Sequence, residues 1–225
     1  MNTHTVTIAA FDFDGTLSRR DSVVPFLRRF LFRWRSVIGI LRHAPAGFRA
    51  VAQRDRDALR MAATAALLTG VPADEIAQQG AGYAEVILAS RLRTDTSARL
   101  AWHRAQGHRV VFVSASYDSY LIPVAERLGV EAVLSTSVQI DANGLCTGRL
   151  HGANCRGVEK VSRLHGWLTE QRLQRRDVTV WAYGDSKGDT ELLADADHPV
   201  WVQASLGSVA ASPPTPGVAR GDQIS

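Results

Sequence analysis

Residues 11–17 read FDFDGTL, and this stretch decides how the chain is expected to fold. The preceding residues 6–10 form an apolar run of the kind that a parallel sheet buries on both faces. Asp12 and Asp14 follow where that strand should end, which is where open α/β sheets bind ligands. Alternation places both carboxylates on one side, where their charges need a cation or a proton between them. The alternative is that the strand simply ends in polar residues that have no functional role.

Strand-like and helical segments alternate downstream, and this pattern predicts an α/β fold with a doubly wound parallel sheet. Strands are expected at residues 109–113, 131–134, 178–183 and 199–202, and helices at 96–106, 117–128, 158–172 and 190–194. Asn143-Gly144 lies between residues 138–140 and 147–150, which indicates a β-hairpin.

A helical stretch at residues 18–94 interrupts this alternation after the first strand, and we interpret it as an inserted cap over the strand ends. Its first helix is expected to begin after Asp21 or Ser22, and further helices to cover residues 54–68 and 72–89. The catalytic core is then formed by residues 1–17 and 95–204. Residues 205–225 are small, polar and proline-bearing, which predicts a disordered tail.

The start of the cap is strongly basic. Between Arg19 and Arg60 the sequence has 11 Arg and 3 Asp, and an apolar stripe recurs at spacings of three and four over residues 27–41. The simpler interpretation is a solvated basic face of a helix. The alternative is a surface that contacts anionic lipid head groups.

Composition places the chain among ordinary globular proteins. Its 225 residues are 45% hydrophobic and 21% charged, with a net charge of +4 that suits an anionic substrate or a membrane surface. No nucleic-acid-binding motif is present, so no nucleic acid partner is expected. The two cysteines, Cys146 and Cys155, form no metal pattern, and no signal peptide or membrane-spanning run is apparent. We therefore expect a cytoplasmic protein, with peripheral contact at the inner face of the membrane as the alternative; the oligomeric state cannot be predicted.

Polar groups that can do chemistry follow three of the predicted strands: Asp12 and Asp14, then Ser114, then Asp185 and Asp189. Parallel strand ends meet at one edge of a sheet, so these groups are expected to gather there. Several carboxylates without a His or Cys cluster favour Mg²⁺.

Phosphoryl transfer is the chemistry that this set suits best. A carboxylate can attack phosphorus, while a hydroxyl such as that of Ser114 and an ammonium such as that of Lys160 neutralise the phosphoryl oxygens. Lysine is scarce here, since only Lys160 and Lys187 occur among 26 basic residues, which makes Lys160 informative.

The motifs DFDGTL, a strand-ending serine, a helix-opening lysine and GDSKGD resemble those of the haloacid dehalogenase-like (HAD) superfamily of phosphohydrolases, over residues 6–202. The insert resembles the helical cap of the phosphoserine-phosphatase-like branch. The segments SASYDSYLIPVAERLG, NCRGVEK and AYGDSKGDTELLADADHPV look like a bacterial group that includes phosphatidylglycerophosphate phosphatases.

The resemblance implies a role for each motif residue. These roles are a nucleophile and Mg²⁺ ligand at Asp12, a general acid/base with its backbone carbonyl on the metal at Asp14, phosphoryl binding by Ser114 and Lys160, a metal ligand at Asp185, and support of the metal and Lys160 by Asp189. Phosphoserine phosphatases carry the motif lysine just before a glycine, where this chain has Arg156, so Arg156 is the alternative cation. Their amine-binding Glu would fall near Asp21, a shorter acid that counts against phosphoserine and is a candidate for substrate contact.

The resulting prediction is a Mg²⁺-dependent phosphomonoester hydrolase that forms an aspartyl-phosphate on Asp12, with a small or lipid-linked phosphate monoester as substrate. A phosphotransferase that uses an alcohol acceptor in place of water is the alternative among enzymes. A receiver-like signalling module is the alternative from another class, but the helical insert and the second acidic pair, Asp185 and Asp189, count against it. An inactive binding protein is disfavoured because every expected catalytic position is filled.

Overall fold

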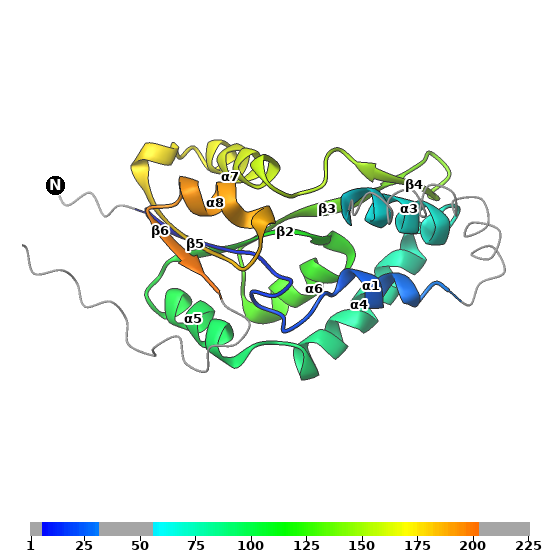
Figure 1. Cartoon of the computed structure of the whole chain (residues 1–225), viewed down its shortest axis with the longest axis horizontal. Helices are drawn as coiled ribbons and strands as arrows, with labels where there is room; N and C mark the ends of the chain where they lie inside the picture. The colour runs from blue at the N-terminus through cyan, green and yellow to red at the C-terminus, as the bar shows by residue number, and fades with distance from the viewer. Residues whose placement is uncertain (1–5, 32–55, 203–225) are drawn as a thin grey trace, which may run out of the picture.

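A computed structural model describes residues 6–31 and 56–202 of the chain (Figure 1). Most of the apolar stripe predicted at residues 27–41, with the arginines around it, and the whole predicted tail lie outside these residues. The strands form one six-stranded sheet in the order β4-β3-β2-β1-β5-β6. Their bounds are β1 Val6–Phe11, β2 Arg109–Tyr117, β3 Ala132–Ile140, β4 Cys146–His151, β5 Val178–Gly184 and β6 His198–Trp201.

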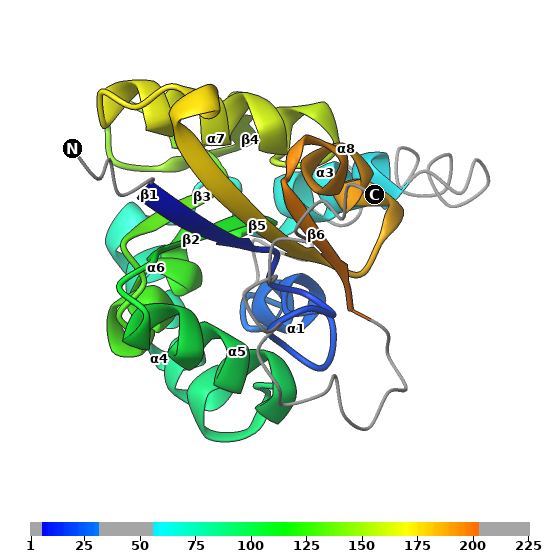
Figure 2. The ribbon, with the colours of Figure 1, turned by 90° about the vertical axis from the view of Figure 1, so that its left-hand side faces the viewer.

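Helices cover both faces of this sheet. Figure 2 shows α7 and α8 on one face, with α5 and α6 on the other, so the predicted doubly wound α/β fold is confirmed. All strand pairs are parallel except β3 with β4, which form the hairpin predicted from Asn143-Gly144. The helices are α1 Val23–Arg28, α3 Arg56–Leu68, α4 Ala73–Ser90, α5 Thr94–Ala105, α6 Asp118–Leu128, α7 Val158–Glu170 and α8 Thr190–Asp195.

Each face of the sheet has its own hydrophobic cluster. Under α7 and α8, apolar side chains of β1, β2 and β5 pack against Leu164, Leu168 and Leu192. This packing places the first turn of α7 above the carboxyl ends of the strands. The opposite cluster combines sheet residues with side chains of α1, α3, α4 and α6.

The ring of Phe26, from α1, lies at the centre of the second cluster. Its centroid is 5.0–6.0 Å from those of Phe30, Tyr83, Tyr117 and Tyr120. These rings come from α1 and its C-terminal flank, α4, the end of β2 and α6. The described helices of the predicted cap are therefore packed into the same core as the sheet. The boundaries of core and cap, 1–17, 18–94 and 95–204, stay a prediction.

The parallel register lines up the ends of the three central strands. Phe11 of β1 is opposite Phe112 of β2 and Tyr183 of β5. Asp12, directly after β1, and Ser114, two residues after Phe112, therefore lie at the same edge of the sheet. The sequence predicted this gathering of polar groups, but the strand expected at residues 109–113 continues to Tyr117, so Ser114 lies within β2 and not after its end.

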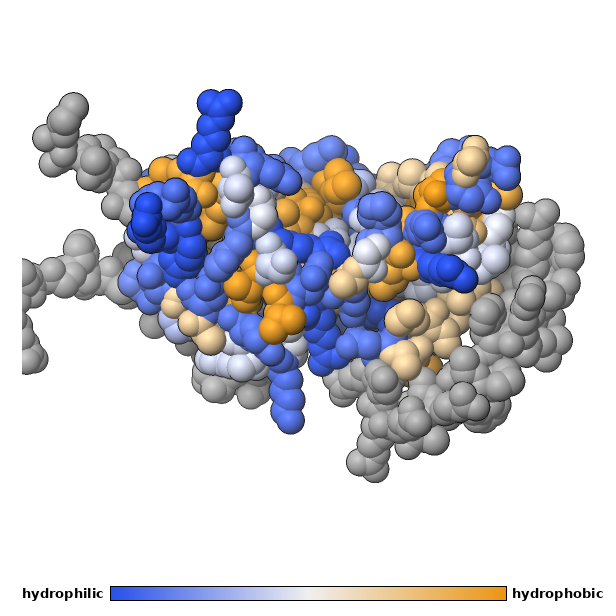
Figure 3. Space-filling view, turned by 90° about the horizontal axis from the view of Figure 1, so that it is seen from above, coloured by the Kyte–Doolittle hydropathy of each residue, from blue (hydrophilic) through white to orange (hydrophobic). Residues whose placement is uncertain are grey.

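In the view of Figure 3, hydrophobic residues form small groups scattered among hydrophilic ones. Within the described part of the chain, no helix is both long enough and apolar enough to cross a bilayer.

His103, in the last turn of α5, and His108, shortly after this helix, lie side by side. The Nδ1 atoms of His103 and His108 are 2.7 Å apart, and Nε2 of His103 is 2.8 Å from the hydroxyl of Tyr183. His103 is fully buried. Burial, with smaller contributions from His108 and Arg99, lowers the pKa of His103 to about 3.

This shift predicts an acid-sensitive fold. Unfolded His103 takes up a proton below about pH 6.5, whereas the folded imidazole stays neutral down to about pH 3, so stability falls as pH drops through this window. The contribution is about 1.4 kcal/mol per pH unit below 6.5. His103→Gln should flatten the dependence of the unfolding free energy on pH, measured by urea titration between pH 7.5 and 5. Parallel curves for both proteins would contradict this assignment.

A second prediction concerns the crossing of α4 over α6. A Cβ atom at Gly80 would lie 2.0 Å from the backbone oxygen of Ser119, so this position has no room for a side chain. Gly80→Ala should reduce the unfolding free energy by about 1–3 kcal/mol. Gly82 is the matched control, since its Cβ would meet only Nη2 of Arg29, at 3.5 Å. Gly82→Ala should therefore stabilise the same helix by about 1 kcal/mol, and equal effects at both positions would be inconsistent with the close crossing.

Candidate active site

A pocket of about 280 Å³ opens at the carboxyl ends of β1, β2 and β5. It is lined by every site residue that the sequence predicted, namely Asp12, Asp14, Asp21, Ser114, Lys160, Asp185 and Asp189. Arg156, the alternative cation, also lines it. The fold thus brings together residues that are up to 177 positions apart in the chain (12 to 189).

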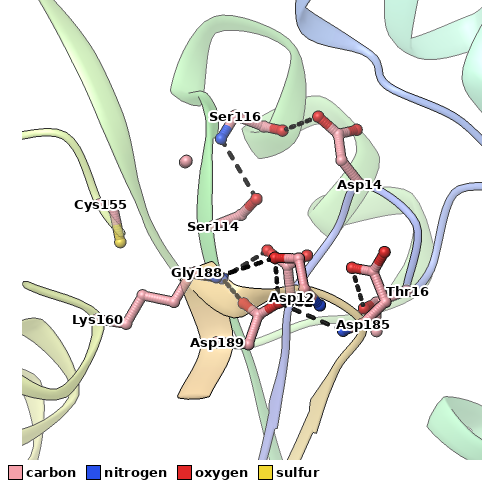
Figure 4. Close-up of polar contacts among 12 residues, drawn as sticks. Asp12, Asp14, Thr16, Ser114, Ser116, Cys155, Lys160, Asp185, Gly188 and Asp189 are labelled. Carbon is pink, nitrogen blue, oxygen red and sulfur yellow. Dashed lines mark hydrogen bonds and ion pairs between the residues drawn. The ribbon is translucent and has the colours of Figure 1, made fainter. Parts of the chain in front are cut away.

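Lys160 lies at the base of this pocket between two carboxylates (Figure 4). Its Nζ atom is 2.6 Å from Oδ1 of Asp12 and 2.5 Å from Oδ1 of Asp189, and its side chain is only 2% exposed. Burial opposes the charge of Lys160, but the two carboxylates outweigh this effect and raise its pKa. Burial also raises the pKa of Asp12, although Lys160 acts in the opposite direction.

The carboxylates of Asp12, Asp185 and Asp189 form a cluster that fits a divalent cation. One oxygen from each lies within 4.8 Å of the others, and among the described residues no other group of three His, Cys, Asp or Glu side chains meets this criterion. Burial, followed by the charges of Asp12 and Asp189, raises the pKa of Asp185 to about 6. Three carboxylates facing one ammonium leave an excess of negative charge, and their hard oxygen atoms match the preference of Mg²⁺.

Asp189 has both oxygens engaged within the protein. Oδ1 contacts Lys160, while Oδ2 accepts hydrogen bonds from the backbone nitrogen of Ser186 at 3.0 Å and from its hydroxyl at 2.8 Å. Asp189 therefore holds Lys160 and shapes the loop after β5. Asp12 and Asp185 are the members of the cluster better placed to offer an oxygen to a metal.

Asp14 is held apart from the Lys160 cluster by hydroxyl and amide donors. Its Oδ1 accepts a hydrogen bond from the backbone nitrogen of Ser22 and its Oδ2 accepts one from Oγ of Ser116, both at 2.9 Å. Ser22 Oγ lies in turn 2.7 Å from the hydroxyl of Tyr120. Burial raises the pKa of Asp14 to about 7, against the effect of these hydrogen bonds. An acid with this pKa can both give and accept a proton near neutral pH.

Ser22 and Ser116 were not predicted as site residues. Ser116 had a signal in the sequence, because it lies two positions after Ser114 at the end of the same strand and so shares its side. Ser114 itself is 1% exposed, and its Oγ accepts a hydrogen bond from the backbone nitrogen of Ser116 at 3.3 Å. No comparable signal marks Ser22, which reaches the site through the packing of α1.

The geometry distinguishes Lys160 from Arg156. Arg156 Nη1 lies 3.3 Å from each carboxylate oxygen of Asp57, on α3, at the mouth of the pocket. Its side chain packs over Gly188, where an added Cβ would come within 2.7 Å of Nε. Lys160, rather than Arg156, is therefore the cation that contacts Asp12.

Three polar residues of the predicted cap face the same pocket. Asp21 is exposed and accepts a hydrogen bond from the backbone nitrogen of Val24 at 2.8 Å, so it both caps α1 and lines the pocket. Arg60 donates from Nη1 to the carbonyl of Ala115 at 2.8 Å. Asp57 and Arg60 had no signal in the sequence, because their place at the pocket depends on how α3 packs.

Comparisons with known proteins agree with this fold and identify the family. The model of the haloacid dehalogenase-like hydrolase family matches residues 9–194. Protein CicA of Caulobacter vibrioides is 39% identical over 197 residues, which cover 87% of this chain and 85% of that protein. Histidinol-phosphatase of Neisseria meningitidis serogroup C is 29% identical over 102 residues, or 44% of this chain and 46% of that protein.

Solved structures share the fold at low sequence identity. A Bordetella pertussis Tohama I protein of unknown function has a TM-score of 0.62 at 24% identity, covering 84% of this chain and 86% of its own. Phosphoserine phosphatase in its apo form has a TM-score of 0.55 at 17% identity, with 85% and 83% covered. The family expected from the motifs is confirmed, and with it the prediction of an enzyme: the chain belongs to the haloacid dehalogenase-like hydrolases.

Proposed function

We propose that this hydrolase is a Mg²⁺-dependent phosphomonoesterase that carries the phosphoryl group on Asp12. The observation behind the proposal is the buried contact of Asp12 with Lys160 at the base of a pocket rich in carboxylates. The names of the similar proteins, histidinol-phosphatase and phosphoserine phosphatase, support the same reaction class. The resemblance to phosphatidylglycerophosphate phosphatases stays a prediction.

Asp12 is the nucleophile in this proposal. Its carboxylate attacks phosphorus, the bond from phosphorus to the ester oxygen breaks, and an aspartyl-phosphate is left on Asp12. Lys160 orients Asp12 and, together with the hydroxyl of Ser114, binds the phosphoryl oxygens. Mg²⁺ would be held by Asp12 and Asp185, with the backbone carbonyl of Asp14 and support from Asp189, and would neutralise charge on those oxygens.

Asp14 is the general acid and base in this proposal. As an acid it donates a proton to the departing alcohol oxygen, and as a base it then takes one from the water that hydrolyses the aspartyl-phosphate. Free phosphate leaves, and both carboxyl groups return to their starting states. The hydrogen bonds from Ser22 and Ser116 hold the Asp14 carboxyl at the pocket, so that the same group can serve both steps.

The leaving group is expected to be polar. Among the described lining residues none carries a large apolar side chain, whereas Asp21, Asp57 and Arg60 place both signs of charge on the cap side. A small phosphate monoester suits this pocket. A lipid-linked substrate would have to keep its acyl chains outside it, at an anionic membrane that the protein contacts peripherally.

Phosphate release from a panel of monoesters, with and without Mg²⁺, tests the proposal. The panel comprises phosphoserine, histidinol phosphate, phosphocholine, sugar phosphates, nucleotides and phosphatidylglycerophosphate. We expect metal-dependent release from at least one compound in water alone. Turnover that appears only when an alcohol is supplied, with the phosphorylated alcohol as product, would instead support a phosphotransferase.

Asp12→Asn should abolish turnover of the best substrate. The amide is a poor nucleophile, so phosphate release should fall by more than about a thousandfold. Asp177→Asn, which removes a half-exposed carboxylate remote from the pocket, is the control and should leave the rate unchanged. Undiminished turnover in folded Asp12→Asn protein would end the covalent mechanism.

Lys160→Gln should reduce the turnover of the best substrate far more than Arg156→Gln does. Loss of the ammonium removes the only cation in contact with Asp12 among the described residues, so Lys160→Gln should lose most of its kcat. Arg156→Gln removes a cation that pairs with Asp57 at the pocket mouth and should keep most of its turnover. Circular dichroism confirms folding, and the opposite ranking of the two variants would assign the phosphoryl contact to Arg156.

A further inference from the structure

A second hollow, of about 310 Å³, lies outside the catalytic pocket and is lined by Arg19, Arg20, Ser90 and Arg91. None of these residues lines the catalytic pocket. The arginines belong to the two connections that join the predicted cap to the core, one after β1 and the other between α4 and α5, and Ser90 is the last residue of α4 (Figure 1).

Backbone hydrogen bonds hold these two connections together. The nitrogen of Arg19 donates to the carbonyl of Arg91, and the nitrogen of Arg93 donates to the carbonyl of Leu17, both at 2.9 Å. Arg19 Nε donates to the carbonyl of Leu92 at 3.2 Å. Residues more than 70 positions apart in the chain are therefore fixed side by side, and the arginines share one hollow because of this pairing.

The arginines of this hollow form no ion pair within the described part of the chain. Among the described residues no carboxylate lies within 4.0 Å of a guanidinium nitrogen of Arg19, Arg20 or Arg91. Asp21, next to Arg20 in sequence, accepts a hydrogen bond on Oδ2 from the backbone nitrogen of Val24. Three gathered cations repel one another, and an anion in the hollow would relieve this repulsion.

The guanidinium of Arg91 is also in contact with an aromatic ring. It lies over the ring of Tyr83, 5.6 Å from its centroid. The Ser90 hydroxyl donates to the carbonyl of Val86, so it is not the donor that an anion would meet. Recognition would therefore rest on the arginines.

We propose that Arg19, Arg20 and Arg91 form a binding site for a phosphate-type anion. The planar guanidinium fork matches two oxygens of a phosphate, and several forks around one hollow favour a group with more than one negative charge. A phosphomonoester dianion has this chemistry, whether it is soluble or is the head group of an anionic lipid. The site is separate from the catalytic pocket and does not depend on the proposed reaction.

The ordinary alternative is a cluster of solvated arginines that attracts anions only through net charge. The two interpretations differ in one respect that can be measured. If the arginines form a specific site, affinity for the anion falls only when these arginines are replaced. If binding depends on net charge alone, affinity falls equally wherever two arginines are removed.

Two charge-matched double variants make this comparison. Arg19→Gln with Arg91→Gln removes the site, and Arg149→Gln with Arg176→Gln removes two exposed arginines that do not line the hollow. Binding is measured to phosphatidylcholine vesicles with and without phosphatidic acid, and to pyrophosphate by calorimetry in EDTA. Thermal melting checks folding, and Arg20→Gln with Arg91→Gln is a second site variant that keeps the Arg19 contact to Leu92.

The site variants should bind at least about tenfold more weakly than the wild type and the control double variant. If the site variants lose affinity only for phosphatidic acid vesicles, the ligand is a lipid head group. If they lose affinity for pyrophosphate, the ligand is a soluble phosphate compound. Equal binding by the site and control variants in both assays would overturn the proposal. Failure of the wild-type protein to bind either probe would overturn it as well.

Discussion

The contact of the Lys160 ammonium with Asp12 and Asp189 is the interaction on which the site depends. Burying these carboxylates without a cation would be strongly unfavourable, and removing one partner from a buried ion pair typically costs about 3–5 kcal/mol. Lys160 stands in the first turn of α7, a helix that is held on the sheet by Leu164 and Leu168. The hydrophobic core therefore fixes the position of the ammonium that compensates the buried charge of Asp12, the proposed nucleophile.

The second constraint is the parallel register of the central strands. It brings the carboxyl ends of β1, β2 and β5 to one edge of the sheet. Short acidic and hydroxyl side chains that are far apart in the chain therefore lie close together there. The site then divides into two environments. Asp12 faces an ammonium, whereas Asp14 faces Ser22 and Ser116 and keeps a raised pKa. Two carboxylates two positions apart are thus suited to different tasks, one as a nucleophile and one as an acid and base.

The described cap helices have a structural task and a chemical one. Phe26 and Tyr83 join the aromatic cluster with Tyr117 and Tyr120 of the core, which holds α1 and α4 against the sheet. Asp21, just before α1, and Asp57 and Arg60, on α3, line the catalytic pocket, while Arg19 and Arg91 line the second hollow. The described cap segments therefore both pack against the core and supply polar side chains to the two hollows.

The sequence by itself determined the order of strands and helices, the polar strand ends and the family, because apolar periodicity and motif spacing are local properties of the chain. It also singled out Lys160, through the scarcity of lysine. Only the tertiary structure decided that Lys160 rather than Arg156 meets Asp12, and that Ser22 reaches Asp14. It alone paired the buried His103 with His108, and Arg19 with Arg91 at the cap connections. These contacts depend on how segments that are distant in the sequence, or joined by a turn, pack against one another. The spacing of residues along the chain does not specify that packing.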